Sequence, residues 1–158
     1  MSIASDVVAT VELVVNTVVT ASTLRNSSNV VPTIHKRKFP VVSTEDESVV
    51  IILTLGTEEY EPATGEDDFA FFVYYPVTVT IVLTTTTSGV LKESDLIRQL
   101  RESIKKKLLD FRRLTLSNAL PLDDIDAIAT PRYLKPALKS GYDYIQLSVK
   151  VKTREGRT

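Results

Sequence analysis

The stretch that most constrains this chain is the sequence FAFFVYYPVTVTIVL at 69–83. Every odd position in it is apolar, whereas the even positions become mainly polar in the second half, at Thr78 and Thr80. This alternation is typical of a β-strand with one buried face. At about 3.3 Å per residue such a strand would extend roughly 50 Å, beyond the usual length. Pro76 has no N–H to donate, so we expect the strand to bend there or to lie at a sheet edge.

A second apolar run, VVIILTL at Val49–Leu55, precedes the long stretch. Acidic residues before this run and Gly56 after it predict a short strand that is covered on both faces. Pro62 and Gly65 then predict a loop over 56–68. We therefore expect a long antiparallel hairpin with a projecting acidic tip at 56–68.

Two helices are predicted. The clearest covers 95–111, where apolar residues form one stripe and Ser94 is a suitable N-cap. Residues 6–20 are ambiguous, because their valines favour a strand whereas the apolar period favours a helix. We expect a helix there, although Leu13 fits its apolar face badly.

The remaining segments predict one more strand and its connections. At 144–153 apolar residues alternate with polar and basic ones, so we expect one buried face and one wet, basic face. The sequence at 125–129 is compatible with a short strand. The polar segment 21–38 predicts a connector or an extended arm, and 154–158 a short polar tail.

These elements predict a single α/β (α+β) domain over 1–158, with a mostly antiparallel sheet packed by the 95–111 helix and the N-terminal helix. The chain has no cysteine, which excludes disulfides, thiolate metal sites and cysteine catalysis. Asp6 and Glu12 interrupt the apolar N-terminal stretch, and no basic region precedes it. We therefore expect neither a signal peptide nor a membrane span, and a soluble intracellular protein.

No catalytic motif is present, and we expect no enzyme, no cofactor and no metal. The carboxylate cluster at Asp123, Asp124 and Asp126 lacks the glycine and terminal glutamate of a calcium loop, so a turn or helix cap after Pro121 is the better interpretation. His35 is the only histidine and lies in a basic segment, 35–38. This segment could contact phosphate, but a solvated surface loop is the simpler interpretation.

Charge is unevenly distributed, although the net charge is only −1. Nine acidic and no basic residues fall in 45–68, whereas 98–113 holds seven basic and two acidic residues. One interpretation is two solvated surfaces. The other is a self-complementary molecule, whose acidic hairpin meets the basic helix of a neighbouring copy and so generates a closed ring.

The order of elements and the closing phrase GYDYIQLSVKV at 141–151 resemble the tail terminator or tail-completion proteins of long-tailed bacteriophages. The resemblance covers 41–153 and leaves 21–38 unmatched. It implies a virion protein of the phage neck, assembled in the host cytoplasm as a hexameric ring. Such a ring binds tail-tube protein on one face and head-connector protein on the other, and DNA passes through its lumen. The family has no catalytic residues to assign.

We therefore expect a structural ring subunit, with a neck, adaptor or tail-tube subunit as the nearest alternative. The alternative of another class is a small nucleic-acid-binding module that uses Lys105–Lys107, Arg112 and Arg113 together with the basic face of 144–153. The residues expected at the subunit interface or lumen are acidic, aromatic or basic: Glu58, Glu59, Glu61, Glu66, Asp67, Asp68, Phe72, Tyr74, Arg98, Arg101 and Lys105.

Overall fold

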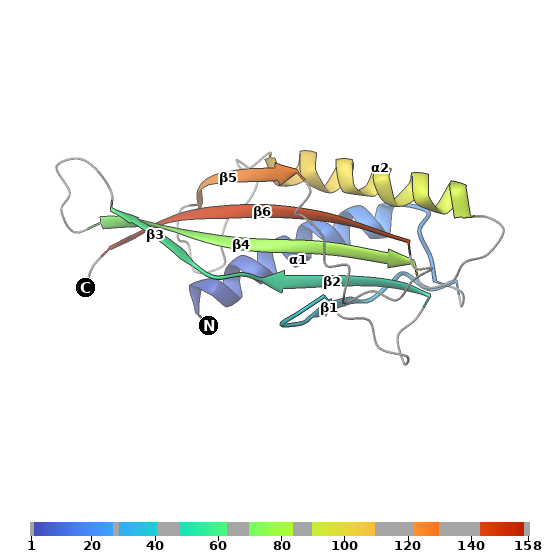
Figure 1. Cartoon of the computed structure of the whole chain (residues 1–158), viewed down its shortest axis with the longest axis horizontal. Coiled ribbons are helices and arrows are strands. Elements are labelled where there is room, and N and C mark those ends of the chain that lie inside the picture. Colours follow the sequence, from blue (N-terminus) through green and yellow to red (C-terminus); the bar gives the residue numbers. More distant parts are fainter. Residues whose placement is uncertain are drawn as a thin grey trace.

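A computed structural model describes residues 2–26, 29–40, 48–62, 70–83, 90–109, 122–129 and 143–156. These residues form two helices and a six-stranded sheet in the strand order β1-β2-β4-β6-β5, with β3 also paired to β4 (Figure 1). The elements are α1 (Ile3–Ala21), β1 (Ile34–Lys36), β2 (Val49–Leu55), β3 (Glu59–Pro62), β4 (Ala70–Leu83), α2 (Val90–Leu109), β5 (Leu122–Ala129) and β6 (Asp143–Gly156).

The long strand predicted from the alternation is β4, and it occupies the middle of the sheet. It pairs antiparallel with β2 on one side, from Val49↔Leu83 to Leu55↔Val77. On the other side it pairs antiparallel with β6 over fourteen residues, from Ala70↔Gly156 to Leu83↔Asp143. Only β1 runs parallel to its neighbour. The α+β class, the mostly antiparallel sheet and the long hairpin are thereby confirmed.

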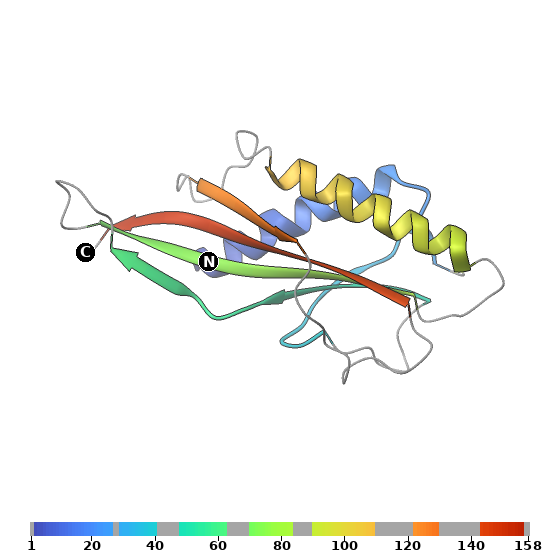
Figure 2. The ribbon, with the colours of Figure 1, turned by 45° about the horizontal axis from the view of Figure 1, so that its top comes forward.

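Both helices cover the same face of the sheet, as the views in Figures 1 and 2 agree. The odd residues of β4 and β6 point to this face and join α1 and α2 in one hydrophobic core. Leu100 and Ile104 of α2 are 3 % and 1 % exposed, as their place in the apolar stripe predicts. The helix begins at Val90, so the prediction of Ser94 as its N-cap is wrong, and Phe111 lies outside the described residues.

The ambiguous N-terminal segment is a helix, as predicted. The Ser2 hydroxyl caps it by accepting a hydrogen bond from the Ser5 amide at 3.1 Å. Its valines at helical spacing are buried, whereas Leu13 on the opposite side is 67 % exposed. By length and by a mean hydropathy of 1.6, α1 could also cross a membrane, a test that core helices pass as well. In this fold its apolar stripe packs against the sheet.

Four segments differ from the sequence predictions because long-range pairing organises them. The connector 21–38 contributes β1, and the 56–68 loop contributes β3. Residues Arg154–Gly156 continue β6 and are no tail. The aspartates 123, 124 and 126 lie in β5, with a register shift between Leu122 and Asp124, so they form no helix cap.

Pro76 does not lie at a sheet edge, and β4 continues through it. Its missing N–H is tolerated because it faces the gap between the end of β2 and the start of β3. The Gly56 amide donates to the Pro76 carbonyl at 2.8 Å, which makes these residues ladder partners. Such partners normally exchange two hydrogen bonds, so the bond that Pro76 cannot donate would go to the Gly56 carbonyl. Gly56 lies just after the end of β2, so the missing bond interrupts no strand pairing. Between Leu55↔Val77 and Glu59↔Tyr74, one strand has three residues and the other has two. This extra residue is a β-bulge that separates β3 from β2.

The sheet face opposite the helices is less wet than the alternation in 144–153 predicts. Val50, Ile52 and Val82 form a second buried cluster there, with Tyr144 against it. Gln146 is also buried, and its side-chain amide donates to the Thr80 hydroxyl at 3.1 Å. The described cations of β6 on this face, Lys150 and Lys152, lie nearer the end of that strand.

Candidate assembly surfaces

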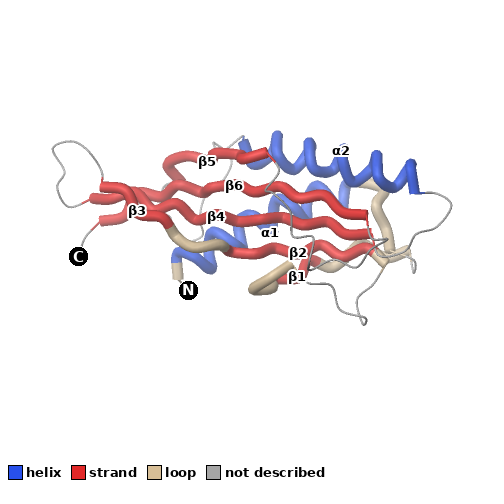
Figure 3. Tube along the Cα trace, in the orientation of Figure 1, coloured by secondary structure: helices blue, strands red, loops and turns tan. Residues whose placement is uncertain are grey.

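The end of the sheet formed by β3, the start of β4 and the end of β6 projects beyond both helices (Figure 3). We call this part, residues 58–62, 70–75 and 150–156, the tip. It forms because β4 and β6 are paired over their full fourteen residues and run past the start of α1 (Figure 3). On the helix side Val73, Tyr75 and Val151 are still buried in the core, and residues 151–153 also pair with β5. The tip therefore has a mostly buried helix-side face and an outer face with accessible side chains.

The outer face of the tip, opposite the helices, interleaves acidic, aromatic and basic side chains. The Lys152 Nζ lies 4.0 Å from the centroid of the Phe72 ring, a cation–π contact. The Tyr74 hydroxyl donates to a Glu61 carboxylate oxygen at 2.8 Å. The Lys150 Nζ donates to Glu59 at 3.1 Å. The acidic residues are thus partly neutralised within the subunit.

The helix-side face of the tip has a second set of contacts. Glu155 accepts from the Tyr75 hydroxyl at 2.9 Å and from the Thr153 hydroxyl at 2.7 Å. Burial of the phenol and its bond to Glu155 raise the pKa of Tyr75 well above 10.0. Tyr60, which is 65 % exposed, donates to Glu58 at 2.7 Å, and this bond raises the pKa of Tyr60. Both phenols therefore remain protonated donors at neutral pH.

Helix α2 covers the half of the sheet away from the tip, and its last turn lies near the middle of the long axis (Figure 1). Arg101 is largely buried and its Nε donates to the Gln146 carbonyl at 3.1 Å, so it anchors the helix to β6. Arg98 is exposed, with its guanidinium 4.0 Å from Asp95. Lys105 is half-buried, and Lys106 and Lys107 are exposed in the last turn. Arg98 and the lysines are available to a partner, whereas Arg101 acts mainly within the fold.

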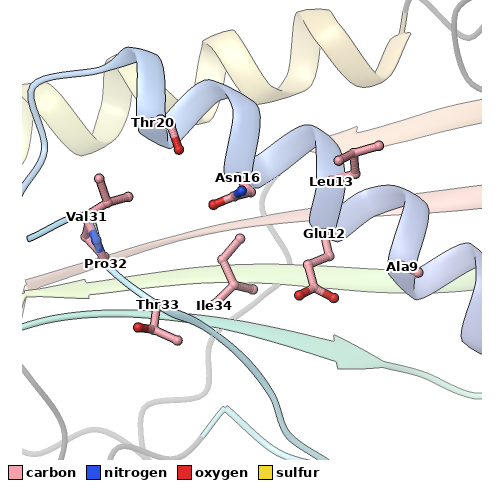
Figure 4. A pocket seen from close by; sticks show the side chains of 9 residues that line it. All are labelled: Ala9, Glu12, Leu13, Asn16, Thr20, Val31, Pro32, Thr33 and Ile34. Atoms are coloured by element: carbon pink, nitrogen blue, oxygen red, sulfur yellow. The ribbon is translucent and has the colours of Figure 1, made fainter.

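An open groove of about 530 Å³ lies between α1 and residues 31–34, which lead into β1 (Figure 4). Its walls mix apolar and neutral polar side chains with one carboxylate, Glu12, whose Oε2 lies 3.1 Å from the Lys36 Nζ. Among the described residues no group of three or more histidine, cysteine, aspartate or glutamate side chains could hold a metal ion. The groove thus offers neither a nucleophile with a base nor a metal-ligand set.

The structure brings some of the predicted residues together and separates others. Glu58, Glu59, Glu61, Phe72 and Tyr74 meet at the tip, whereas the three cations of α2 lie far from it. The predicted residues Glu66, Asp67 and Asp68 lie outside the described part of the chain.

Sequence reasoning missed the basic and acidic partners that β6 contributes to the tip. Lys150 and Lys152 occupy even positions of the 144–153 alternation, as Phe72 and Tyr74 do in 69–83. Matching these two alternations would have placed the four side chains on one face, had the pairing of the strands been known. Glu155 carried no such signal, because it lay in the predicted tail.

No protein-family model matches the chain, and no curated protein matches it. A function therefore has to be inferred from the two surfaces and from the resemblance in the sequence.

Proposed function

We propose that the chain is a structural subunit that assembles with further copies into a ring. The ring would be the one that terminates the tail tube of a long-tailed phage and joins it to the head connector. Its partners would be tail-tube protein on one face and a connector or neck protein on the other, with DNA passing through the lumen. The proposal extends the resemblance of the closing strand and the element order, and it requires no catalytic group.

The observation that carries the proposal is the separation of two surfaces on one elongated subunit: the tip lies at one end, whereas α2 covers the half of the sheet away from it (Figure 1). Phe72 and Tyr74 are only partly buried on the tip. A projecting sheet end with accessible aromatic side chains is a favourable surface for contact with another protein. Complementary surfaces at opposite ends of a subunit form head-to-tail contacts, and these close into rings when the rotation allows.

Charge supports the same contact but does not dominate it. Arg98, Lys106 and Lys107 are exposed on α2, with Lys105 half-buried beside them, while the exposed Glu61 and the half-buried Glu58 lie on the tip. Exposed ion pairs contribute only about 0–1 kcal/mol each, so the aromatic surface should provide most of the affinity. Acidic residues that reach the lumen would repel DNA phosphates and keep a passing duplex from sticking.

The test is the mass of the purified chain by light scattering over a concentration series, alone and with tail-tube protein. Phe72→Glu should abolish the ring, because it places a charge in the proposed contact. The same variant should leave the subunit folded, since the new carboxylate lies beside Lys152. Leu13→Glu is the matched control, because Leu13 is exposed on α1 and away from both surfaces.

Raising the salt concentration should weaken the ring only modestly. A chain that stays small with and without tail-tube protein, yet binds duplex DNA in low salt and releases it steeply as salt rises, would refute the ring. That behaviour would instead assign the basic face of α2 to nucleic-acid binding.

A further inference from the structure

Two short strands of opposite charge lie on the same edge of the sheet. β1 and its continuation, residues 35–38, carry three positive charges on Lys36, Arg37 and Lys38, with His35 neutral. β3 and the residue before it, 58–61, carry three negative charges on Glu58, Glu59 and Glu61. Among the described residues, no strand pairs with the outer edge of either β1 or β3.

The two strands are offset along this edge and across it. β1 lies level with Ile51–Leu53 of β2, which in turn pair with residues 79–81 of β4. β3 pairs with β4 at residues 71–74, so it begins five residues, or about 16 Å, farther toward the tip. Because β1 pairs with β2 and not with β4, it also stands one strand spacing, about 4.8 Å, farther out than β3. The edge therefore has a basic step that protrudes and an acidic step that is recessed.

We infer that two copies of this chain associate edge to edge across a two-fold axis, with β1 of each copy against β3 of the other. The two strands lie on one edge, so they can face each other between copies only after a two-fold rotation. That rotation places each protruding β1 in the recess beside the partner's β3. At each of the two contacts the strands β2, β1 and the partner's β3 then lie between the two β4 strands, so one continuous sheet runs through both copies.

The charges select this pairing over the others that the edges permit. β1 against β1, or β3 against β3, would oppose like charges, which is destabilising in a sheet. The edge strand β5 contains three aspartates, so it too would repel β3. Residues 35–38 are basic or histidine at every position, so the complementarity to 58–61 is present on both faces and in any register.

Existing contacts leave the charged groups in reach of a partner. Lys36 is 58 % exposed although its Nζ is bonded to Glu12, and Lys38 is exposed. The Glu59 side chain is 57 % exposed although it accepts from Lys150, and Glu61 is also exposed. In Figure 2 the outer edge of β3 faces away from the rest of the described chain. Strand addition at such an edge is a common recognition mode.

This contact is distinct from the proposed ring contact, because it uses β1 and requires nothing of α2. The two contacts share Glu59 and Glu61, so a copy that is paired edge to edge has its tip occupied. The pair would be the form of the isolated chain, and ring assembly would require it to separate.

A charge-swap experiment tests the inference with the full chain. Lys36→Glu with Lys38→Glu changes the charge of 35–38 from +3 to −1, and Glu59→Lys with Glu61→Lys changes that of 58–61 from −3 to +1. Each variant alone then has like charges at both joints, and its dissociation constant by analytical ultracentrifugation should rise about tenfold or more. An equimolar mixture should form a heterodimer, because both joints are again of opposite charge. The chain that carries all four changes should recover the homodimer.

Arg98→Glu is the matched control, because it reverses a charge of α2 and should leave the pair intact. Heterodimer formation also proves that each variant is folded. The inference is overturned if the wild-type chain is monomeric at high concentration, or if only the β1 variant dissociates. It is equally overturned if the mixture does not pair.

Discussion

Gly56, the residue after β2, lies close to the ring of Pro76, and the effect of this contact on stability can be measured. A Cβ built on Gly56 would lie 2.9 Å from the Pro76 Cγ and 3.5 Å from its Cβ. The first distance is shorter than folded proteins allow, whereas the second is ordinary contact. Pro76 is held in the central strand by pairing on both sides, so only the pucker of its ring can relieve the contact.

Gly56→Ala should therefore destabilise the protein by about 1–2 kcal/mol, the lower part of the range for overpacking. Without the contact, the same change would stabilise by about 0.4–1 kcal/mol, because alanine restricts the unfolded chain. The backbone of Gly56 is outside the left-handed region, so alanine adds no conformational strain there. The sign of the effect thus depends on the proline ring alone.

The assay is urea unfolding of four proteins: the wild type, Gly56→Ala, Pro76→Ala and the double variant. With Pro76 changed to alanine the Cγ is gone, and Gly56→Ala should become neutral or slightly stabilising. The coupling free energy between the two sites should then be about 1–3 kcal/mol. An equal loss from Gly56→Ala in both backgrounds would refute the contact as the cause.

Three further outcomes are expected. Ile104→Ala, at a 1 % exposed site, should cost about 2–5 kcal/mol in denaturant titration, whereas Leu13→Ala, at a 67 % exposed site, should change stability by under about 0.5 kcal/mol. Because the pKa of Tyr75 is raised in the folded state, its contribution to the unfolding free energy is complete below pH 10.0 and is lost as the pH rises above that value. Tyr75→Phe should therefore make the unfolding free energy depend less on pH between about pH 9 and about pH 11. Lys152→Met should lower the unfolding free energy by about 0.5–1 kcal/mol in the wild type and by less in a Phe72→Leu background, because the second background lacks the cation–π contact. Equal losses in the two backgrounds would contradict that contact.

The sequence predicted the elements whose pattern is local and long. The alternation in 69–83 identified β4, and the apolar stripe in 95–111 identified α2, because each buries one face against the core. In α1 the helical period outweighed the strand preference of valine, since burial of a continuous stripe exceeds an intrinsic propensity of a few tenths of a kcal/mol per residue.

The short strands were not predictable in the same way. β1 has three residues and β3 has four, and neither shows an alternation of its own. Each is a strand because a longer neighbour, β2 or β4, offers unpaired backbone groups at that place. Such pairing depends on the register of distant residues, which a single sequence does not contain.

The candidate surfaces were predictable to the same extent. The acids at 58–61 and the aromatics at 72 and 74 lie close together because β3 and β4 are consecutive paired strands of one hairpin. Lys150 and Lys152 reach the same face only through the pairing of β4 with β6, some eighty residues apart in the chain. Arg101 was assigned to a partner, yet it bonds to the Gln146 carbonyl within the subunit.

The bulge between β2 and β3 has a consequence for local opening. β2 is held by β4 on one side and by β1 on the other, whereas among the described strands β3 is held by β4 alone, through four residue pairs. A strand attached in this way can detach while the β4–β6 ladder stays closed, so it should form a separate cooperative unit of low stability. In native-state hydrogen exchange, the amides of Glu59 and Glu61, which face β4, should therefore lose protection through a local opening. That of Ile52, which faces β4 from β2, should exchange only through global unfolding.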